Sequence, residues 1–172
     1  MSTFSIRDAR PGDELPVAQV HVRTWQVAYR GLLPDAYLDA LQPEDRARRY
    51  TFGDRSPDAP RTLVALDGPE LIGFATVRVD PGEPFVGELA ALYVEPAHWN
   101  RGAGLALIAA ARARLAACRC RAARLWLLDG NHRGERFYRR DGWQPDGTRR
   151  SDRVWDTDVV ELGFRRAIEP AP

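Results

Sequence analysis

Residues 87–115 read GELAALYVEPAHWNRGAGLALIAAARARL, and the fold of the whole chain depends on this stretch. The uninterrupted apolar run 89–94 predicts a buried strand, and Pro96 ends it because proline offers no N–H to a sheet. Gly102 and Gly104 follow, and the alanine- and leucine-rich residues after them have strong helix propensity. The stretch therefore predicts a strand, a glycine turn and a long helix.

The glycine turn has the features of a phosphate-binding site. Two glycines at a helix start leave backbone N–H groups unobstructed, where the helix dipole favours negative charge. A P-loop would need Lys and then Ser or Thr after the second glycine, where Leu105 and Ala106 stand. A dinucleotide-binding fingerprint would need a third small residue where Leu107 stands. Both alternatives fit badly, and a loop that merely turns the chain remains open.

Residues 99–104, WNRGAG, resemble the pyrophosphate loop Gln/Arg-x-x-Gly-x-Gly/Ala of the GCN5-related N-acetyltransferase (GNAT) family. The resemblance implies that backbone amides of this loop bind acetyl-CoA, and we expect no metal. Trp99 departs from the family's Gln or Arg, which matters little if the amides make the contacts. The cofactor-binding residues implied on the strand and in the loop are Leu92, Tyr93, Val94, Trp99, Asn100, Arg101, Gly102, Ala103, Gly104 and Leu105.

The composition bounds the classes of partner. The net charge is +1, so no basic field suggests a nucleic acid. All 25 basic residues are arginine, which is typical of a GC-rich genome, and no apolar run approaches the ~20 residues of a membrane span. Cys118 and Cys120 lack further ligands at metal spacing, so we expect free thiols in a reducing compartment. We therefore expect a cytoplasmic, bacterial protein.

The rest of the chain predicts one domain over residues 1–172, with a frayed tail at 167–172. Strands are expected over 4–9, 61–66, 71–79, 122–128, 143–149 and 158–166, and helices from about 13, 34, 43 and 131. An Asp-Gly turn at 67–68 predicts an antiparallel hairpin, and the helical crossover from 89–94 to 122–128 predicts a parallel pair. This order resembles the GNAT fold, of class α/β (α+β). The resemblance implies a mixed, mostly antiparallel sheet of six to seven strands with four to five helices, whose central parallel pair splays apart around the cofactor.

Residues 131–143, NHRGERFYRRDGW, are similar to a second pattern of that family, Asn-x-x-Ala-x-x-Phe-Tyr-x-x-x-Gly-Phe. The resemblance implies that Asn131 hydrogen-bonds the pantetheine or the adjacent backbone, although a helix N-cap explains it equally well. It also implies that Tyr138 is the general acid beside the leaving sulfur, and the alternative is a half-buried tyrosine packed on its neighbour. The cofactor contacts implied here are Asn131, Gly134, Phe137 and Tyr138.

Direct acetyl transfer to a primary amine requires a neutral amine, a polarised thioester carbonyl and a proton for the departing thiolate. The resemblance implies that a backbone N–H near Tyr93 or Val94 holds the carbonyl. Glu88 precedes Gly102 by the same distance as the glutamate base of the histone-acetylating branch. It is therefore a candidate base, and a strand carboxylate paired with an arginine is the alternative. His21 and His98 are weaker candidates, which we expect to be packed and on the loop surface respectively.

The family resemblance implies that the first two helices and the last hairpin shape the acceptor site. Trp25, Tyr29 and Glu88 are the candidate substrate-binding residues, because aromatic faces attract ammonium groups, although core packing also explains the two rings. Asp152, Asp156 and Asp158 either attract a cationic substrate or form a solvated hairpin. We expect a small-molecule or peptide amine acceptor, no nucleic-acid or membrane partner, and a monomer or homodimer. A catalytically silent acyl-CoA-binding or sensor domain is the alternative function.

Overall fold

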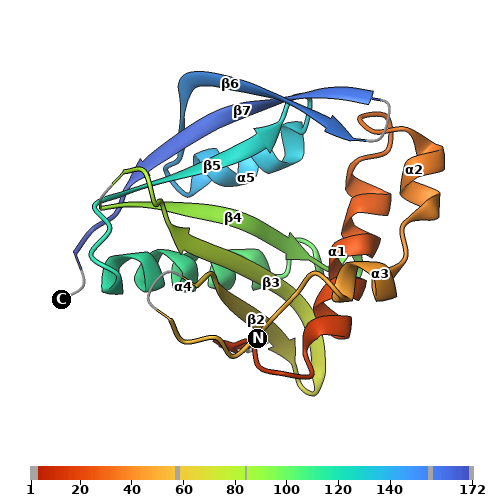
Figure 1. Cartoon of the computed structure of the whole chain (residues 1–172), viewed down its shortest axis with the longest axis horizontal. Helices are drawn as coiled ribbons and strands as arrows, with labels where there is room; N and C mark the ends of the chain where they lie inside the picture. Colours follow the sequence, from red (N-terminus) through yellow and green to blue (C-terminus); the bar gives the residue numbers. More distant parts are fainter. Residues whose placement is uncertain (1–3, 57–58, 84, 155–156, 171–172) are drawn as a thin grey trace.

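The computed structural model describes residues 4–56, 59–83, 85–154 and 157–170 (Figure 1). The strands in this part of the chain are β1 (Ser5–Asp8), β2 (Arg61–Asp67), β3 (Glu70–Val79), β4 (Val86–Val94), β5 (Ala122–Leu128), β6 (Gln144–Val154) and β7 (Thr157–Ala167). The helices are α1 (Glu14–Ala28), α2 (Asp35–Ala40), α3 (Pro43–Ala47), the short 3-10 helix η1 (Pro96–His98), α4 (Ala103–Ala117) and α5 (His132–Arg140).

The described strands form one seven-stranded sheet in the order β1-β2-β3-β4-β5-β7-β6. β4 and β5 run parallel, and every other neighbouring pair is antiparallel. The predicted fold class, the hairpin at residues 67–68 and the parallel central pair are thus confirmed.

Helices cover both faces of the sheet. On β2, Leu63 and Ala65 join the core cluster under α4, whereas Val64 between them packs with Val17 and Val20 of α1. This alternation follows from strand geometry, in which successive side chains point to opposite faces. In Figure 1, α4 lies under β4, and α1, α2 and α3 gather at one end of the sheet.

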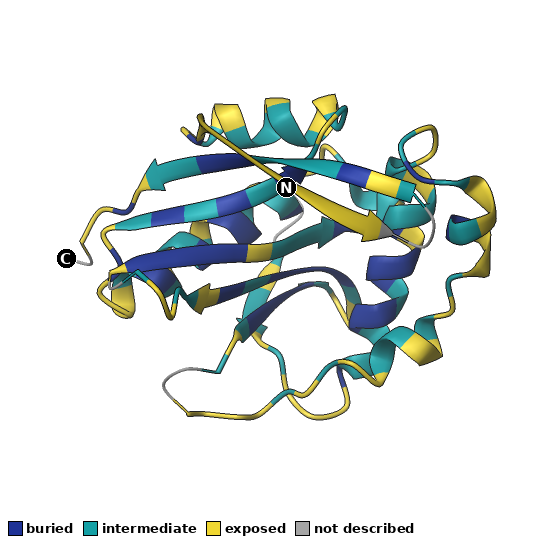
Figure 2. Ribbon diagram, turned by 45° about the horizontal axis from the view of Figure 1, so that its top comes forward, coloured by how far each residue is buried: buried dark blue, intermediate teal, exposed yellow. Residues whose placement is uncertain are grey.

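Three expected boundaries were wrong. β4 begins at Val86 rather than Leu89, because Gly87 has no side chain to collide with α4: an added Cβ would lie 2.4 Å from a Leu115 methyl. β6 extends beyond Arg149 to Val154 as an edge strand, whose exposed residues 144–153 carry no burial signal (Figure 2). The C-terminal tail is ordered further than expected, since Ile168 is buried and its N–H donates to the Arg121 carbonyl at 2.9 Å.

The central parallel pair separates along its length. β4 and β5 pair only over Val86–Glu88 and Ala122–Arg124, although the strands continue to Val94 and Leu128. Figure 1 shows the two ribbons diverging toward α1. β4 also has an irregularity, because Ala91 pairs with Thr76 and Leu89 pairs with Val77, which leaves Ala90 between them unpaired. The facing edges beyond Glu88 therefore present backbone groups that this pair does not satisfy.

Candidate active site

The glycine turn stands beside the end of β4 and before α4. Gly102 is the N-cap residue of α4 with φ +97°, a left-handed conformation that disfavours residues with a Cβ. An added Cβ would meet only Phe4, at 3.9 Å, so backbone conformation rather than crowding requires glycine here. No cap side chain accepts from the first turn of α4, and that turn holds no acidic residue. Its N–H groups therefore suit an anionic ligand.

Gly104 has a packing role in addition to the phosphate-binding role expected from the sequence. An added Cβ would lie 3.2 Å from Cε2 and 3.4 Å from Cζ of Phe137. Since Phe137 belongs to α5, Gly104 allows α4 and α5 to pack closely. The sequence placed both glycines in the phosphate-binding turn, whereas this contact gives the second one a packing role as well.

Trp99 connects the turn to three other elements. Its Nε1 donates to the Val94 carbonyl at 2.7 Å, and the Thr24 hydroxyl of α1 donates to the same oxygen at 3.1 Å. The guanidinium carbon of Arg133, from α5, lies 3.3 Å from the Trp99 ring centroid, a cation–π contact. Burial, followed by the nearby Arg136, lowers the pKa of Arg133. A cation from α5 thus rests where the loop itself lacks the family's Gln or Arg.

The second motif forms the start and the inner face of α5. Asn131 is the N-cap, and its Oδ1 accepts from the Gly134 N–H at 2.9 Å. A Cβ on Gly134 would lie 2.9 Å from a Leu127 methyl, so this chain has no room there for the family's alanine. The N-cap interpretation of Asn131 is therefore confirmed, and its contact with pantetheine stays a prediction.

Tyr138 is half-buried between Phe137 and Trp143, with ring centroids 5.3 Å and 6.3 Å away. Burial raises the pKa of its phenol well above the ordinary value, and the neighbouring Tyr93 raises it further. The hydroxyl therefore keeps its proton over the whole working range of pH and can act only as a neutral donor or acceptor.

A cluster of rings lies on the opposite face of β4 from α4. We call His21, Trp25, Tyr29, Tyr50 and Tyr93 the ring cluster. His21 stands 4.9 Å from Trp25 and 4.8 Å from Tyr93, and Trp25 stands 5.2 Å from Tyr29, measured between centroids. The three α1 residues therefore share one stripe, as their spacing predicted. All members except His21 are half-buried, so solvent reaches the cluster.

The two histidine expectations had opposite outcomes. His21 is buried, and its Nδ1 lies 2.7 Å from the Tyr50 hydroxyl, so the expected packing is confirmed. Burial, and secondly the charge of Arg46, lowers the pKa of His21 well below its usual range. His98 was expected on the loop surface, but only 13% of its side chain is exposed and its Nε2 stands 3.9 Å from Asp67. The reason is that η1 folds back against the β2–β3 turn.

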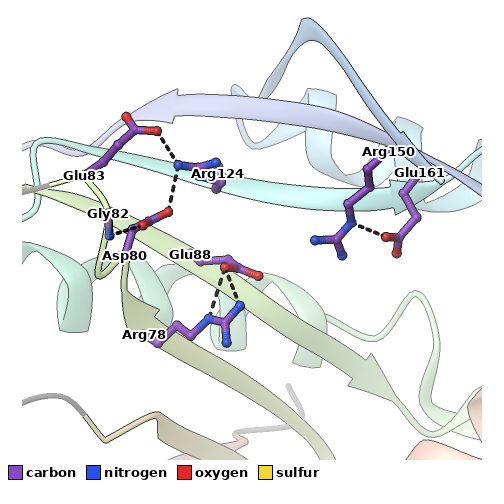
Figure 3. Close-up of polar contacts among 8 residues, drawn as sticks. All are labelled: Arg78, Asp80, Gly82, Glu83, Glu88, Arg124, Arg150 and Glu161. Atoms are coloured by element: carbon purple, nitrogen blue, oxygen red, sulfur yellow. Dashed lines mark hydrogen bonds and ion pairs between the residues drawn. The ribbon is translucent and has the colours of Figure 1, made fainter. Parts of the chain in front are cut away.

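Glu88 is buried at the closed end of the parallel pair, on the face opposite α4. Its Oε2 accepts from Nε and Nη2 of Arg78 at 3.1 Å and 2.8 Å (Figure 3). The register places Glu88 beside Arg124, which is itself held by Asp80 and Glu83. The carboxylate paired with an arginine, one of the two interpretations, is therefore what the structure contains. Both bonds end on one oxygen, and within the described residues Oε1 accepts none.

Comparison with known proteins identifies the family. The profile of the acetyltransferase (GNAT) family matches residues 22–143. YuaI, an uncharacterized N-acetyltransferase of Bacillus subtilis, is 30% identical over 109 residues, and the alignment spans 61% of this chain and 60% of that protein. The chain thus covers about three fifths of the length of this relative.

Solved structures show the same fold at lower identity. The PaiA N-acetyltransferase of Thermoplasma acidophilum, in complex with coenzyme A, has a TM-score of 0.74 at 20% identity, over 96% of this chain and 99% of that one. The ribosomal-protein-S18-alanine N-acetyltransferase of Escherichia coli has a TM-score of 0.67 at 16% identity, over 99% and 97%.

The chain therefore belongs to the GNAT family, the N-acetyltransferases whose acetyl donor is acetyl-CoA. Within the described ranges, no helix is long and apolar enough to cross a membrane. The same ranges hold no group of three or more His, Cys, Asp or Glu side chains arranged for a metal ion.

Proposed function

We propose that this chain moves the acetyl group of acetyl-CoA to a primary amine of a small molecule or peptide by direct attack. The observation that carries the proposal is the glycine-capped start of α4 beside the separating ends of β4 and β5. A helix start without side-chain caps suits pyrophosphate, and unpaired strand edges suit the amide-bearing pantetheine arm.

Most of the proposed contacts with the cofactor are made by backbone groups. The turn 99–104 would bind pyrophosphate through N–H groups, and the free edge of β4 at Leu92–Val94 would bind the pantetheine amides. The irregularity at Ala90 supports this, because it changes the direction of the strand where pairing with β5 has ended. Asn131 would donate from its side-chain Nδ2 to the pantetheine, since its Oδ1 already caps α5.

Acetyl-CoA supplies the activated acetyl group. A backbone N–H near Tyr93 or Val94 would stabilise charge on the carbonyl oxygen, and Tyr138 would donate its proton or a hydrogen bond to the thiolate. The raised pKa of Tyr138 keeps the phenol protonated and makes it a weaker acid, which supports donation of a hydrogen bond to the thiolate more than full transfer of the proton.

Glu88 is the proposed base, acting through a water molecule. Its Oε2 is occupied by Arg78, and Oε1 is the oxygen that could accept a proton. Its neighbours on the strand, Gly87 and Leu89, face α4, so the carboxylate lies on the same side of the sheet as the ring cluster.

The test combines binding with turnover. Calorimetric titration with CoA measures the cofactor site, and a panel of amines with acetyl-CoA, monitored through the free CoA thiol, measures transfer. We expect CoA binding in the wild type and in Tyr138→Phe, with turnover mainly in the wild type. Binding without transfer to any amine would leave an acyl-CoA-binding domain instead of an enzyme.

A further inference from the structure

Arg46 brings a positive charge to the ring cluster. It lies on α3, with its guanidinium carbon 5.7 Å from the centroid of Tyr50. Burial lowers the pKa of His21, and the charge of Arg46 lowers it further. Burial raises the pKa of Tyr50 and Tyr93, and Arg46 offsets part of that rise, so all three groups lie within reach of its field. The cation therefore faces the same side of β4 on which the amine would attack.

This guanidinium has no counter-ion in the described part of the chain. No described carboxylate stands within ion-pair distance of Arg46, and its Nε is buried with no hydrogen-bond partner. Trp25 Nε1 is also buried and makes no hydrogen bond of ordinary geometry among the described residues, although it lies near the Tyr93 hydroxyl and helps to lower the pKa of that phenol. A buried donor left unsatisfied destabilises the protein, because it has lost its hydrogen bond to water. Both orphan groups are donors, so what would complete them is an acceptor oxygen.

Four carboxylates around the ring cluster are already paired with arginine. Glu161, whose charge reaches Tyr29 and Tyr93, is bonded to Arg150, and Glu88 is bonded to Arg78 (Figure 3). Asp35 and Asp39 of α2 both pair with Arg30. A polycationic acceptor would have to displace an arginine from one of these pairs, whereas an anionic group would find Arg46 unpaired.

We propose that the acceptor is an amphoteric small molecule of the amino-acid class, and that Arg46 binds its acidic group. The proposal rests on the proposed function and specifies its substrate. A carboxylate or a phosphonate would accept from the guanidinium fork, with Trp25 Nε1 as a second donor. The ring faces of Trp25 and Tyr93 would lie along the apolar part of the molecule while its amine points toward β4.

The experiment uses matched acceptors that differ only in charge. Amino acids, their carboxamides and the corresponding aminophosphonates are compared with a polyamine, using CoA release for kcat/KM. We expect the wild type to prefer each acid over its amide by about 10- to 100-fold. In Arg46→Gln the KM for the acids should rise until the preference is lost, with the amides unaffected. Arg46→Lys should keep part of it, and comparison of carboxylates with phosphonates identifies the acid.

Arg49→Gln is the matched control, because Arg49 is an exposed arginine one turn further along. It should retain the preference, and calorimetric CoA affinity should be equal in all variants. Thermal unfolding measures acceptor binding independently of turnover. The amino acids should raise the Tm of the wild-type CoA complex but not that of Arg46→Gln. Equal rates with acids and amides, a preference for the polyamine, or an unchanged preference in Arg46→Gln would overturn the proposal. CoA binding with no transfer to any amine would instead overturn the proposed function, and the thermal shift would then decide the role of Arg46.

Discussion

Replacement of Glu88 by glutamine separates the two interpretations of this carboxylate. The change keeps the shape of the side chain, removes its charge, and replaces the carboxylate that pairs with Arg78 at 2.8 Å by a neutral amide. If Glu88 is the base, Glu88→Gln should remove proton acceptance. If Glu88 serves only to hold Arg78, the loss should be one of stability.

The two losses differ enough in size to be told apart. Arg78 is 47% exposed and Glu88 12% exposed in their side chains, so water screens the pair and its worth is at most about 1 kcal/mol. For a chain of this length that corresponds to a Tm lower by ~2–4 °C. Loss of a general base lowers turnover ~100- to 10,000-fold, or about 2.7–5.5 kcal/mol of barrier.

Arg78→Gln is the matched control, because it breaks the same pair and retains the carboxylate. We expect both variants to lose a similar few degrees in thermal unfolding and to bind CoA equally in calorimetry. Steady-state kinetics with a confirmed acceptor should then show a large loss of kcat in Glu88→Gln alone. If Glu88→Gln turned over like Arg78→Gln, with the wild-type pH profile, Glu88 would be a structural ion-pair partner and the proton would leave by another route.

Three further changes have defined outcomes. Tyr138→Phe keeps the ring contacts, so Tm and CoA affinity should stay while kcat falls about ten- to a thousand-fold, or ~1.4–4 kcal/mol; full turnover would make it a packing residue. Gly102→Ala, at φ +97°, should cost about 1–2 kcal/mol and weaken CoA binding, whereas Gly12→Ala, at φ +101° in open space, should cost stability alone. Because burial lowers the folded-state pKa of His21, its contribution is intact above pH ~6.5 and is lost as the unfolded chain protonates below it, by up to about 1.4 kcal/mol per pH unit. His21→Gln should therefore flatten the fall in Tm from pH 7 to 5, and an unchanged slope would assign that fall to other groups.

Local patterns in the sequence predicted the strands, turns and helices, because these depend on backbone conformation. The run 89–94, the glycine turn and the motif 131–143 have fixed spacings, which strand and helix periodicity translate directly into elements. The stripe of Trp25 and Tyr29 followed from helical spacing in the same way. The predicted strand boundary was wrong where the residue type is not typical of a strand. Gly87 is an example, because it lies in β4 and its missing side chain leaves room for α4.

Contacts of individual arginine side chains carried no comparable signal. Arg133 stacks on Trp99, and Arg46 faces Tyr50, across 34 and 4 positions of sequence respectively, yet neither arginine differs in type from many others in the chain. Whether an arginine is paired depends on the fold around it, as with Arg78 and Arg46. The sequence showed Arg133 two residues after Asn131 and the unusual Trp99, but only the structure shows that the two side chains are in contact.

The hydrogen bonds to the carbonyl of Val94 connect the cofactor turn with the helix α1. Its oxygen accepts from Trp99 in the cofactor turn and from Thr24 of α1, which uses both of its lone pairs. A movement of the turn on cofactor binding would therefore reach α1 through this one atom, and α1 is the helix proposed to face the acceptor. Linkage then requires that each ligand changes the affinity of the other by the same factor. A bisubstrate analysis should show this as double-reciprocal lines that intersect off the abscissa, and Thr24→Val, which removes one of the two donors, should move the intersection onto the abscissa.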